Sequence, residues 1–223
     1  MRIWISSLAA ALVALPAIGG VVTRLAPSHD KLVALTFDAC ERGKPAQFDT
    51  AIGDFLTDNK IPFTIFVTGR FARHNQAVLR RLAGLDFVEI ENHSLDHDNH
   101  MDQLGDAEIR RQIGENDQLL ASITGRHTHY FRFPAGNADA HAVGLAEAMG
   151  YKVVHWSFAS GDPAKTLTPE HLSESVVAST KPGSILIFHI NGRGYSTAAA
   201  LPGIVETLKS RGYRFVTVAE GLR

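Results

Sequence analysis

Beyond residue 30, short apolar runs alternate along the chain with longer amphipathic or polar stretches. The apolar runs have the length and the Val, Ile, Leu and Phe content of strands, and they predict strands over residues 31–38, 62–69, 87–93, 130–134, 152–157, 184–190 and 214–218. The intervening stretches carry helical spacing or helix start and stop residues, and they predict helices over residues 46–59, 71–84, 106–124, 140–150, 168–180 and 198–211. Strands that alternate with helices favour an α/β fold with a parallel sheet, as either a barrel or an open doubly wound sheet.

The first 20 residues have a different pattern. Arg2 is followed by an apolar run over residues 3–18 that only Ser6 and Ser7 interrupt, and small residues end it. An early positive charge, a short apolar run and a small-residue end are typical of a secretory signal peptide. The run is shorter than the roughly 20 residues of a membrane-spanning helix. We therefore expect residues 1–20 to be a signal peptide; the alternatives are an N-terminal anchor and, after it, a buried first helix.

Composition narrows the class of protein and its location. Hydrophobic residues make up 45% of the chain and charged residues 20%, which indicates a globular protein. The 22 basic residues are balanced by 23 acidic ones, so no charge excess points to nucleic acid or an anionic membrane as a partner. Cys40 is the only cysteine, which excludes an internal disulfide. We expect a secreted, periplasmic or cell-envelope protein with no nucleic-acid partner and no integral membrane domain beyond the possible N-terminal anchor.

Ionisable side chains stand where five of the predicted strands end. They are Asp38, His93 with His97, Arg132, Asp162 and His189. In parallel α/β folds the active site lies at the C-terminal ends of the strands. A solvated loop position would explain any one of these residues, but it explains the whole set poorly. The pattern therefore predicts that these residues share one site.

Two of these residues are candidate metal ligands. His93 and His97 are four residues apart and could face one metal, and imidazole suits zinc and other first-row divalent ions. Alone, such a pair is more often a surface coincidence than a metal site. Its position after a strand end favours the metal reading.

The other residues carry acid–base chemistry. Asp38 could act as a general base on a metal-bound water, or it could cap the segment that follows. Arg132 lies in an apolar setting and needs a partner, for which Asp38 is the natural choice. His189 could protonate a leaving amine with Asp162 orienting it, or it could be a core histidine that binds a backbone group.

As a set, these motifs resemble those of the polysaccharide deacetylase, or NodB-homology, family (carbohydrate esterase family 4). In chain order, the five motifs are matched by residues 36–38, residues 93–97, residues 132–134, Trp156 with Asp162, and residues 186–189. The resemblance spans residues 31–220, which we expect to be the catalytic domain. It implies a distorted (β/α)7 barrel.

The resemblance also implies a function. It implies a metal-dependent hydrolase, with zinc as the first choice of metal, that removes N-acetyl groups from a GlcNAc-containing polysaccharide by attack of a metal-bound water. Asp38 would be the base, His189 the acid, and His93 and His97 the metal ligands. Arg132 would hold Asp38, and Asp162 would support His189. The alternatives on the same fold are an O-acetyl esterase, a cyclic-amide hydrolase and an inactive carbohydrate-binding protein.

One position departs from the family pattern. The first motif usually has a second Asp that binds the metal, and here this position is Ala39. Two histidines are an incomplete set for catalytic zinc, which usually has three protein ligands. In an extended segment Glu91 points to the same face as His93, so Glu91 is the first candidate for the missing ligand. Water, Cys40 and Glu41 are the other candidates.

Overall fold

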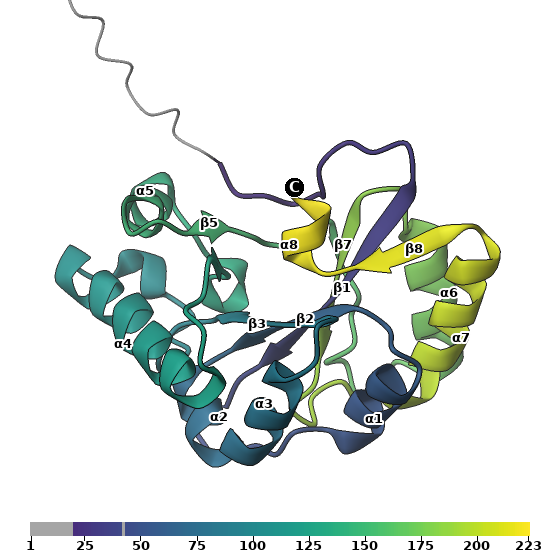
Figure 1. Cartoon of the computed structure of the whole chain (residues 1–223), viewed down its shortest axis with the longest axis horizontal. Helices are drawn as coiled ribbons and strands as arrows, with labels where there is room; N and C mark the ends of the chain where they lie inside the picture. Colours follow the sequence, from purple (N-terminus) through teal and green to yellow (C-terminus); the bar gives the residue numbers. More distant parts are fainter. Residues whose placement is uncertain (1–19, 42) are drawn as a thin grey trace, which may run out of the picture.

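The structure, a computed structural model, describes residues 20–41 and 43–223 (Figure 1). The predicted signal segment therefore lies almost entirely outside the described residues. All the described strands pair in parallel in one sheet, in the order β5-β4-β3-β2-β1-β7-β6, and β8 also pairs with β1. No helix in residues 20–41 or 43–223 is long and apolar enough to cross a membrane.

The bounds of the elements follow the predicted alternation. The strands are β1 Lys31–Ala39, β2 Phe63–Val67, β3 Val88–Asn92, β4 Tyr130–Phe131, β5 Lys152–Val153, β6 Phe158–Ala159, β7 Ser184–His189 and β8 Tyr213–Val216. The α-helices are α1 Thr50–Asp58, α2 Gly69–His74, α3 Gln76–Ala83, α4 Asp106–Thr124, α5 Ala140–Ala148, α6 Pro169–Ser179, α7 Thr197–Ser210 and α8 Val218–Gly221. The predicted α/β class with a parallel sheet is confirmed.

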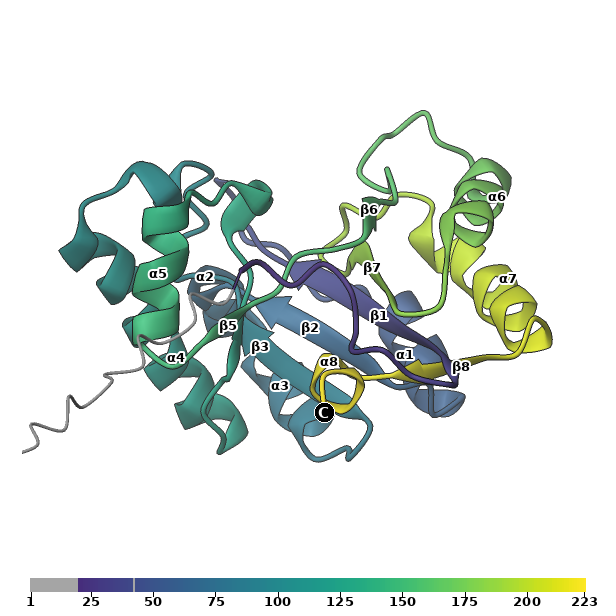
Figure 2. The ribbon, with the colours of Figure 1, turned by 90° about the horizontal axis from the view of Figure 1, so that it is seen from above.

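Strand β1 is the centre of the sheet, and all its residues after Lys31 are buried. It pairs with β7 along one edge, while its other edge pairs with β8 in its first half and with β2 in its second half. The sheet curls around this strand. Residues 20–26 cross the open side, where Val22 bridges to Val154 and Arg24 bridges to Ser184 (Figure 2). The result is a curled, incomplete barrel.

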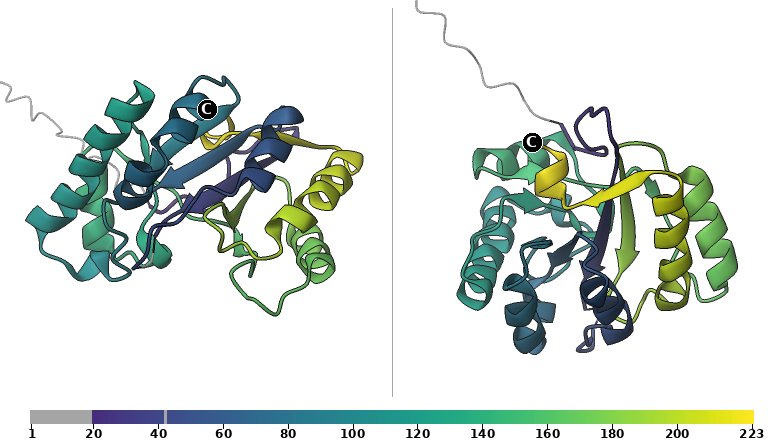
Figure 3. Two further views of the ribbon diagram at one scale, coloured as in Figure 1. Left: turned by 90° about the horizontal axis from the view of Figure 1, so that it is seen from below. Right: turned by 45° about the vertical axis from the view of Figure 1, so that its right-hand side comes forward.

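Helices cover the outside of the curled sheet. Helices α6 and α7 lie side by side at one end, and α4 and α5 lie together at the other (Figures 2 and 3). The largest apolar cluster joins β1, β2 and β7 to the helices, and includes Leu35, Phe37, Phe63 and Leu201. This packing fixes the strand ends from which the site is built.

Some boundaries differ from the predicted ones. Helix α1 begins at Thr50 because the Asp49 side chain accepts hydrogen bonds from the first free backbone N–H groups of the helix. The predicted helix over residues 71–84 is divided at Asn75, whose amide donates to the carbonyls of Phe71 and Ala46. Strand β6 and helix α8 were not predicted, and both are too short to have a recognisable pattern.

Candidate active site

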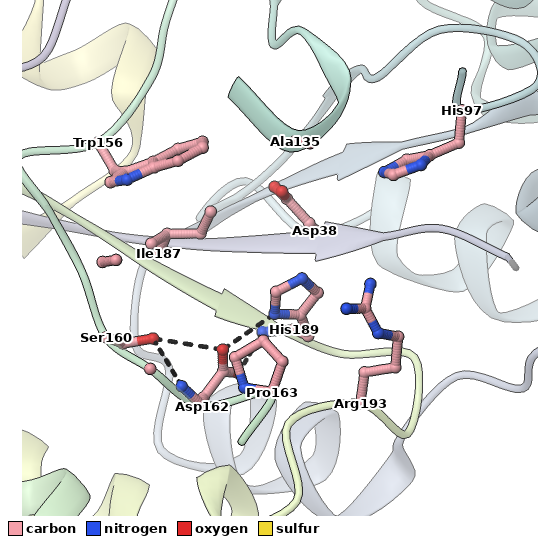
Figure 4. Close-up of a pocket in the computed structure, with 12 residues that line it drawn as sticks. Asp38, His97, Ala135, Trp156, Ser160, Asp162, Pro163, Ile187, His189 and Arg193 are labelled. Carbon is pink, nitrogen blue, oxygen red and sulfur yellow. Dashed lines mark hydrogen bonds and ion pairs between the residues drawn. The ribbon is translucent and has the colours of Figure 1, made fainter. Parts of the chain in front are cut away.

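A cavity of about 230 Å³ lies at the C-terminal ends of β1 and β7 (Figure 4). Asp38 and His189 are register partners on these neighbouring parallel strands, so their side chains lie on the same face of the sheet. The lining includes Asp38, His97, Trp156, Asp162, His189 and Arg193. The predicted meeting of the strand-end residues is therefore seen for Asp38, His97, Asp162 and His189.

The carboxylate of Asp38 is held by a buried arginine. Arg132 Nη1 donates to Asp38 Oδ1 at 2.8 Å, as the sequence predicts, and the Arg132 side chain is completely buried. Its Nε donates to the Val154 carbonyl at 3.2 Å, and its Nη2 donates to the His155 carbonyl at 3.0 Å. The guanidinium also stacks on Phe66, 3.9 Å from the ring centroid. Arg132 thus has one carboxylate partner and no freedom to turn away from it.

Asp38 is ionised in spite of its burial. Burial alone would raise its pKa, but the positive charges of His93 (when protonated), Arg132 and His189 outweigh this effect and lower the pKa to about 2. At neutral pH the side chain is therefore a carboxylate. Its Oδ1 is bound to Arg132, while Oδ2 faces His93.

His93 presents a lone pair to this second oxygen. Its Nδ1 lies 2.8 Å from the carbonyl oxygen of Arg132, which can only accept, so Nδ1 carries the hydrogen. Burial lowers the pKa of His93, which favours the neutral ring. Its Nε2 is buried, has no hydrogen-bond partner among the described residues, and lies 3.4 Å from Asp38 Oδ2. Two lone pairs that face each other in a buried site call for a cation between them.

The spacing of these atoms fits a metal ion. A zinc ion bound to His93 Nε2 at the usual distance of about 2.0–2.1 Å would also lie beside Asp38 Oδ2, which is 3.4 Å from that nitrogen. The His97 ring lies edge-on to the His93 ring, with 4.9 Å between the ring centroids. His97 stands on a turn in which both Ser94 (φ 70°) and His97 (φ 59°) have left-handed backbone, which is costly for residues other than glycine. This strained backbone conformation places the His97 ring beside the His93 ring.

His189 is oriented by Asp162, as predicted. Its Nδ1 lies 2.9 Å from Asp162 Oδ1, and its backbone N–H donates to Asp162 Oδ2 at 2.7 Å. Asp162 also accepts hydrogen bonds from Ser160 and Thr197, and it is almost completely buried. With Nδ1 committed to this carboxylate, the ring keeps Nε2 for other chemistry, and the residue lines the cavity (Figure 4).

Glu91 is not brought to the two histidines. Its Oε2 accepts hydrogen bonds from the backbone N–H groups of His129 and Tyr130, both at 2.8 Å. It lines a different pocket, together with Glu89 and His129. Burial raises the pKa of Glu91 well above its usual value. Its position therefore supports a role in holding the start of β4 rather than the role of third metal ligand.

The other candidate ligands have partners of their own. Cys40 is buried, and its sulfur accepts from Asn191 Nδ2 at 3.3 Å. Glu41 lies 2.8 Å from His74 Nδ1 and accepts from the backbone of Ala46. Within residues 20–41 and 43–223, no group of three or more His, Cys, Asp or Glu side chains is arranged as a metal site.

Two lining residues complete the wall of the cavity. Trp156, part of the predicted fourth motif, packs its indole against Gly136, where an added Cβ would come within 2.6 Å of the ring. Arg193 was not predicted. It follows β7 in the segment Gly192-Arg193-Gly194, and the glycines on either side were the only sequence feature that could have marked it.

Comparisons with known proteins found a matching family model and related proteins. A family model described as polysaccharide deacetylase matches residues 26–154. A peptidoglycan-N-acetylglucosamine deacetylase of Bacillus cereus is 30% identical over 207 residues, which cover 92% of this chain and 94% of the relative.

Solved structures show the same fold. One is a peptidoglycan N-acetylglucosamine deacetylase, with a TM-score of 0.82, 26% identity and coverage of 91% of this chain and 92% of that one. Another is a mutant of a carbohydrate esterase family 4 pseudoenzyme from Bacillus anthracis, with a TM-score of 0.81, 25% identity and coverage of 92% and 71%. The predicted distorted barrel is confirmed by these likenesses.

Proposed function

Because this chain belongs to the polysaccharide deacetylase family, we propose that it removes N-acetyl groups from a GlcNAc-containing polysaccharide. Family membership and the enzyme class that goes with it agree with the prediction from sequence. One observation carries the proposal: Asp38 with its arginine and His189 with its aspartate flank one cavity from adjacent strands. Binding a sugar does not require an oriented base and an oriented acid in the same cavity.

Asp38 acts as the base. It is ionised at neutral pH because its pKa lies at about 2, and Arg132 fixes the direction of its free oxygen. A water molecule beside Oδ2 would give its proton to this carboxylate as its oxygen attacks the amide carbon.

His189 acts as the acid. Its protonated ring would give the Nε2 proton to the amide nitrogen as the carbon–nitrogen bond breaks, while Asp162 holds Nδ1. The proton that Asp38 takes from water and the proton that His189 gives to nitrogen balance the reaction, and the products are acetate and a free amine.

The donors around His93 support a divalent metal, with zinc as the first choice. His93 Nε2 and His97 would hold it, and Asp38 Oδ2 is the nearest carboxylate oxygen to His93 Nε2. A bound metal would supply polarisation of the amide carbonyl and a lower pKa for water. Asp38 Oδ2 keeps the role of base beside this metal, so water would fill the ligand position that Glu91 was expected to fill.

The setting of the reaction belongs to the same proposal. Residues 31–220 form the catalytic domain, and residues 1–20 direct the chain to the periplasm, the cell envelope or the outside of the cell. The name of the B. cereus relative, a peptidoglycan deacetylase, supports an envelope substrate.

The test measures acetate and free amine together. Chitin oligomers and peptide-free peptidoglycan strands are incubated with the full chain, either stripped of metal by EDTA or supplied with Zn²⁺, Co²⁺ or Mn²⁺. Equal amounts of acetate and amine that appear only with metal support the proposal. His97→Gln should abolish them, whereas His100→Gln, a change to an exposed histidine of the same loop, should not.

An inactive carbohydrate-binding protein is the second candidate. Ala39 in place of an aspartate, and the structural likeness to a pseudoenzyme, favour it. Retained sugar binding without acetate under any metal would establish this candidate and overturn the first. Acetate from O-acetylated xylan without any free amine from chitin oligomers would instead indicate an O-acetyl esterase.

A further inference from the structure

Arg193 is a cation on the wall of the cavity that the proposed reaction does not use. We propose that it makes the site selective for N-acetylated sugar chains that carry a carboxylate on the N-acetylated unit or on its neighbour. This inference rests on the proposed function, because it takes the substrate to be an N-acetylated polysaccharide. Figure 4 shows the guanidinium beside the His189 ring at the edge of the cavity.

The charge balance of the cavity leaves Arg193 without a counter-ion. The negative charge of Asp38 is met by Arg132, and the Asp162 carboxylate is satisfied by hydrogen bonds from His189, Ser160 and Thr197. In the described part of the chain, no carboxylate lies within 4.0 Å of the Arg193 guanidinium, whose Nη1 donates to the Cys40 sulfur at 3.8 Å. A cationic group on a partly enclosed wall attracts an anionic group of the ligand.

The loop that carries Arg193 is anchored on both sides. Asn191 Nδ2 donates to the Cys40 carbonyl at 2.6 Å, and Asn191 Oδ1 accepts from the Arg193 backbone at 3.3 Å. A side chain at Gly194 would come within 2.6 Å of the His189 carbonyl and 2.9 Å of Asp162 Oδ2. The loop therefore packs tightly onto the His189–Asp162 pair, and this packing fixes the position of the Arg193 backbone.

A second cation and an exposed aromatic ring lie on the neighbouring loops. Lys165 Nζ lies 5.4 Å from the centroid of the Tyr195 ring. Tyr195 is 50% exposed and is the one large hydrophobic side chain so exposed among residues 20–41 and 43–223. Ser196 Oγ donates to the Leu167 carbonyl at 2.5 Å and ties the two loops together. This rim combines positive charge with an apolar ring face, which suits an anionic sugar chain.

A carboxylate is the group that Arg193 would bind best. The planar guanidinium offers paired N–H donors that match the two oxygens of a carboxylate. A lactyl ether on the sugar or a neighbouring hexuronate could supply this group. If Arg193 instead stabilised the reaction itself, its loss would affect neutral and anionic substrates equally, which separates the two roles.

The test is equilibrium binding by calorimetry, with EDTA present so that nothing is hydrolysed. The ligands are chitin tetrasaccharide, a peptide-free tetrasaccharide of N-acetylglucosamine and N-acetylmuramic acid, and a hyaluronan tetrasaccharide. We expect at least one carboxylated ligand to bind about 10-fold more tightly than the neutral one, a difference of about 1.4 kcal/mol. The two carboxylated ligands distinguish a lactyl source from a hexuronate source.

The variants decide the assignment. In Arg193→Met the carboxylated and neutral ligands should bind about equally, and Arg193→Lys should keep part of the preference for the carboxylated ligand. The control is Arg110→Met, a change to an exposed arginine of helix α4, which should keep the whole preference. A parent protein with no preference, or a preference that survives in Arg193→Met, would overturn the inference. Acetate release from the same ligands, measured separately with metal, tests the proposed function. If the carboxylated ligands bind more tightly but no acetate is released, only the proposed function is overturned. If acetate is released but the carboxylated ligands bind no more tightly than the neutral one, only this inference is overturned.

Discussion

The buried pair of Asp38 and Arg132 offers a sharp test of the site, through the variant Asp38→Asn. The substitution removes the one negative charge that Arg132 contacts among the described residues, and it leaves the shape of the side chain almost unchanged. Arg132 is completely buried, so its charge cannot reach water. Removal of one partner from a buried ion pair costs about 3–5 kcal/mol. Because the Asn oxygen can still accept from Nη1, we expect the lower end, about 3 kcal/mol.

The assay is urea unfolding at pH 7 in the presence of EDTA, so that a metal does not contribute. For a domain of this size, 3 kcal/mol corresponds to a fall in Tm of about 6–12 °C. The double variant Asp38→Asn/Arg132→Met removes the unpaired charge and should recover part of the loss. The control is Asp106→Asn, which removes the carboxylate partner of His141 in an exposed pair and should cost much less than Asp38→Asn.

Two results would refute this reasoning. If Asp38→Asn costs no more than Asp106→Asn, the charge of Arg132 does not depend on Asp38. If the double variant is less stable than Asp38→Asn by the full cost of a lost buried side chain, the carbonyls of Val154 and His155 hold Arg132 more strongly than the carboxylate does.

Three further predictions concern the histidines and the buried glutamates. His93→Gln should lose bound zinc, measured by mass spectrometry of the native protein, whereas Glu91→Gln should keep it because the Glu91 carboxylate binds backbone N–H groups; equal loss in both would restore Glu91 as a ligand. His189→Gln should lower kcat by about 100-fold or more without a change in zinc content, and an unchanged kcat would exclude His189 as the acid. Burial raises the pKa of Glu89, so the folded state holds this proton more tightly than the unfolded state and the parent loses stability as pH rises above about 4.5. The difference in unfolding free energy between Glu89→Gln and the parent should therefore move in favour of the variant as pH rises above about 4.5, and a pH-independent difference in urea unfolding would contradict the burial effect.

The order of strands and helices can be predicted from the sequence because short apolar runs alternate regularly with amphipathic stretches. Each predicted strand is present, and the residues at the ends of β1 and β7 meet because neighbouring parallel strands end at the same side. Partners that complete a charge, such as Arg132 for Asp38, also follow from residue type and an apolar setting. The sequence did not predict the conformation of the loops that follow the strands. The orientation of Arg193 depends on a loop that packs against β7, and no periodic pattern describes such a loop.

Glu91 shows what the alternation of residues along a strand does not predict. The two-residue period correctly places Glu91 on one face with Phe66 and Asp38, which are its neighbours across the sheet. The period gives the face of the sheet but not the groups that surround a side chain on that face. Here the backbone N–H groups of His129 and Tyr130 donate to the Glu91 carboxylate. Glu91 therefore ties β3 to the start of β4, and the carboxylate oxygen that faces His93 Nε2 belongs to Asp38 instead.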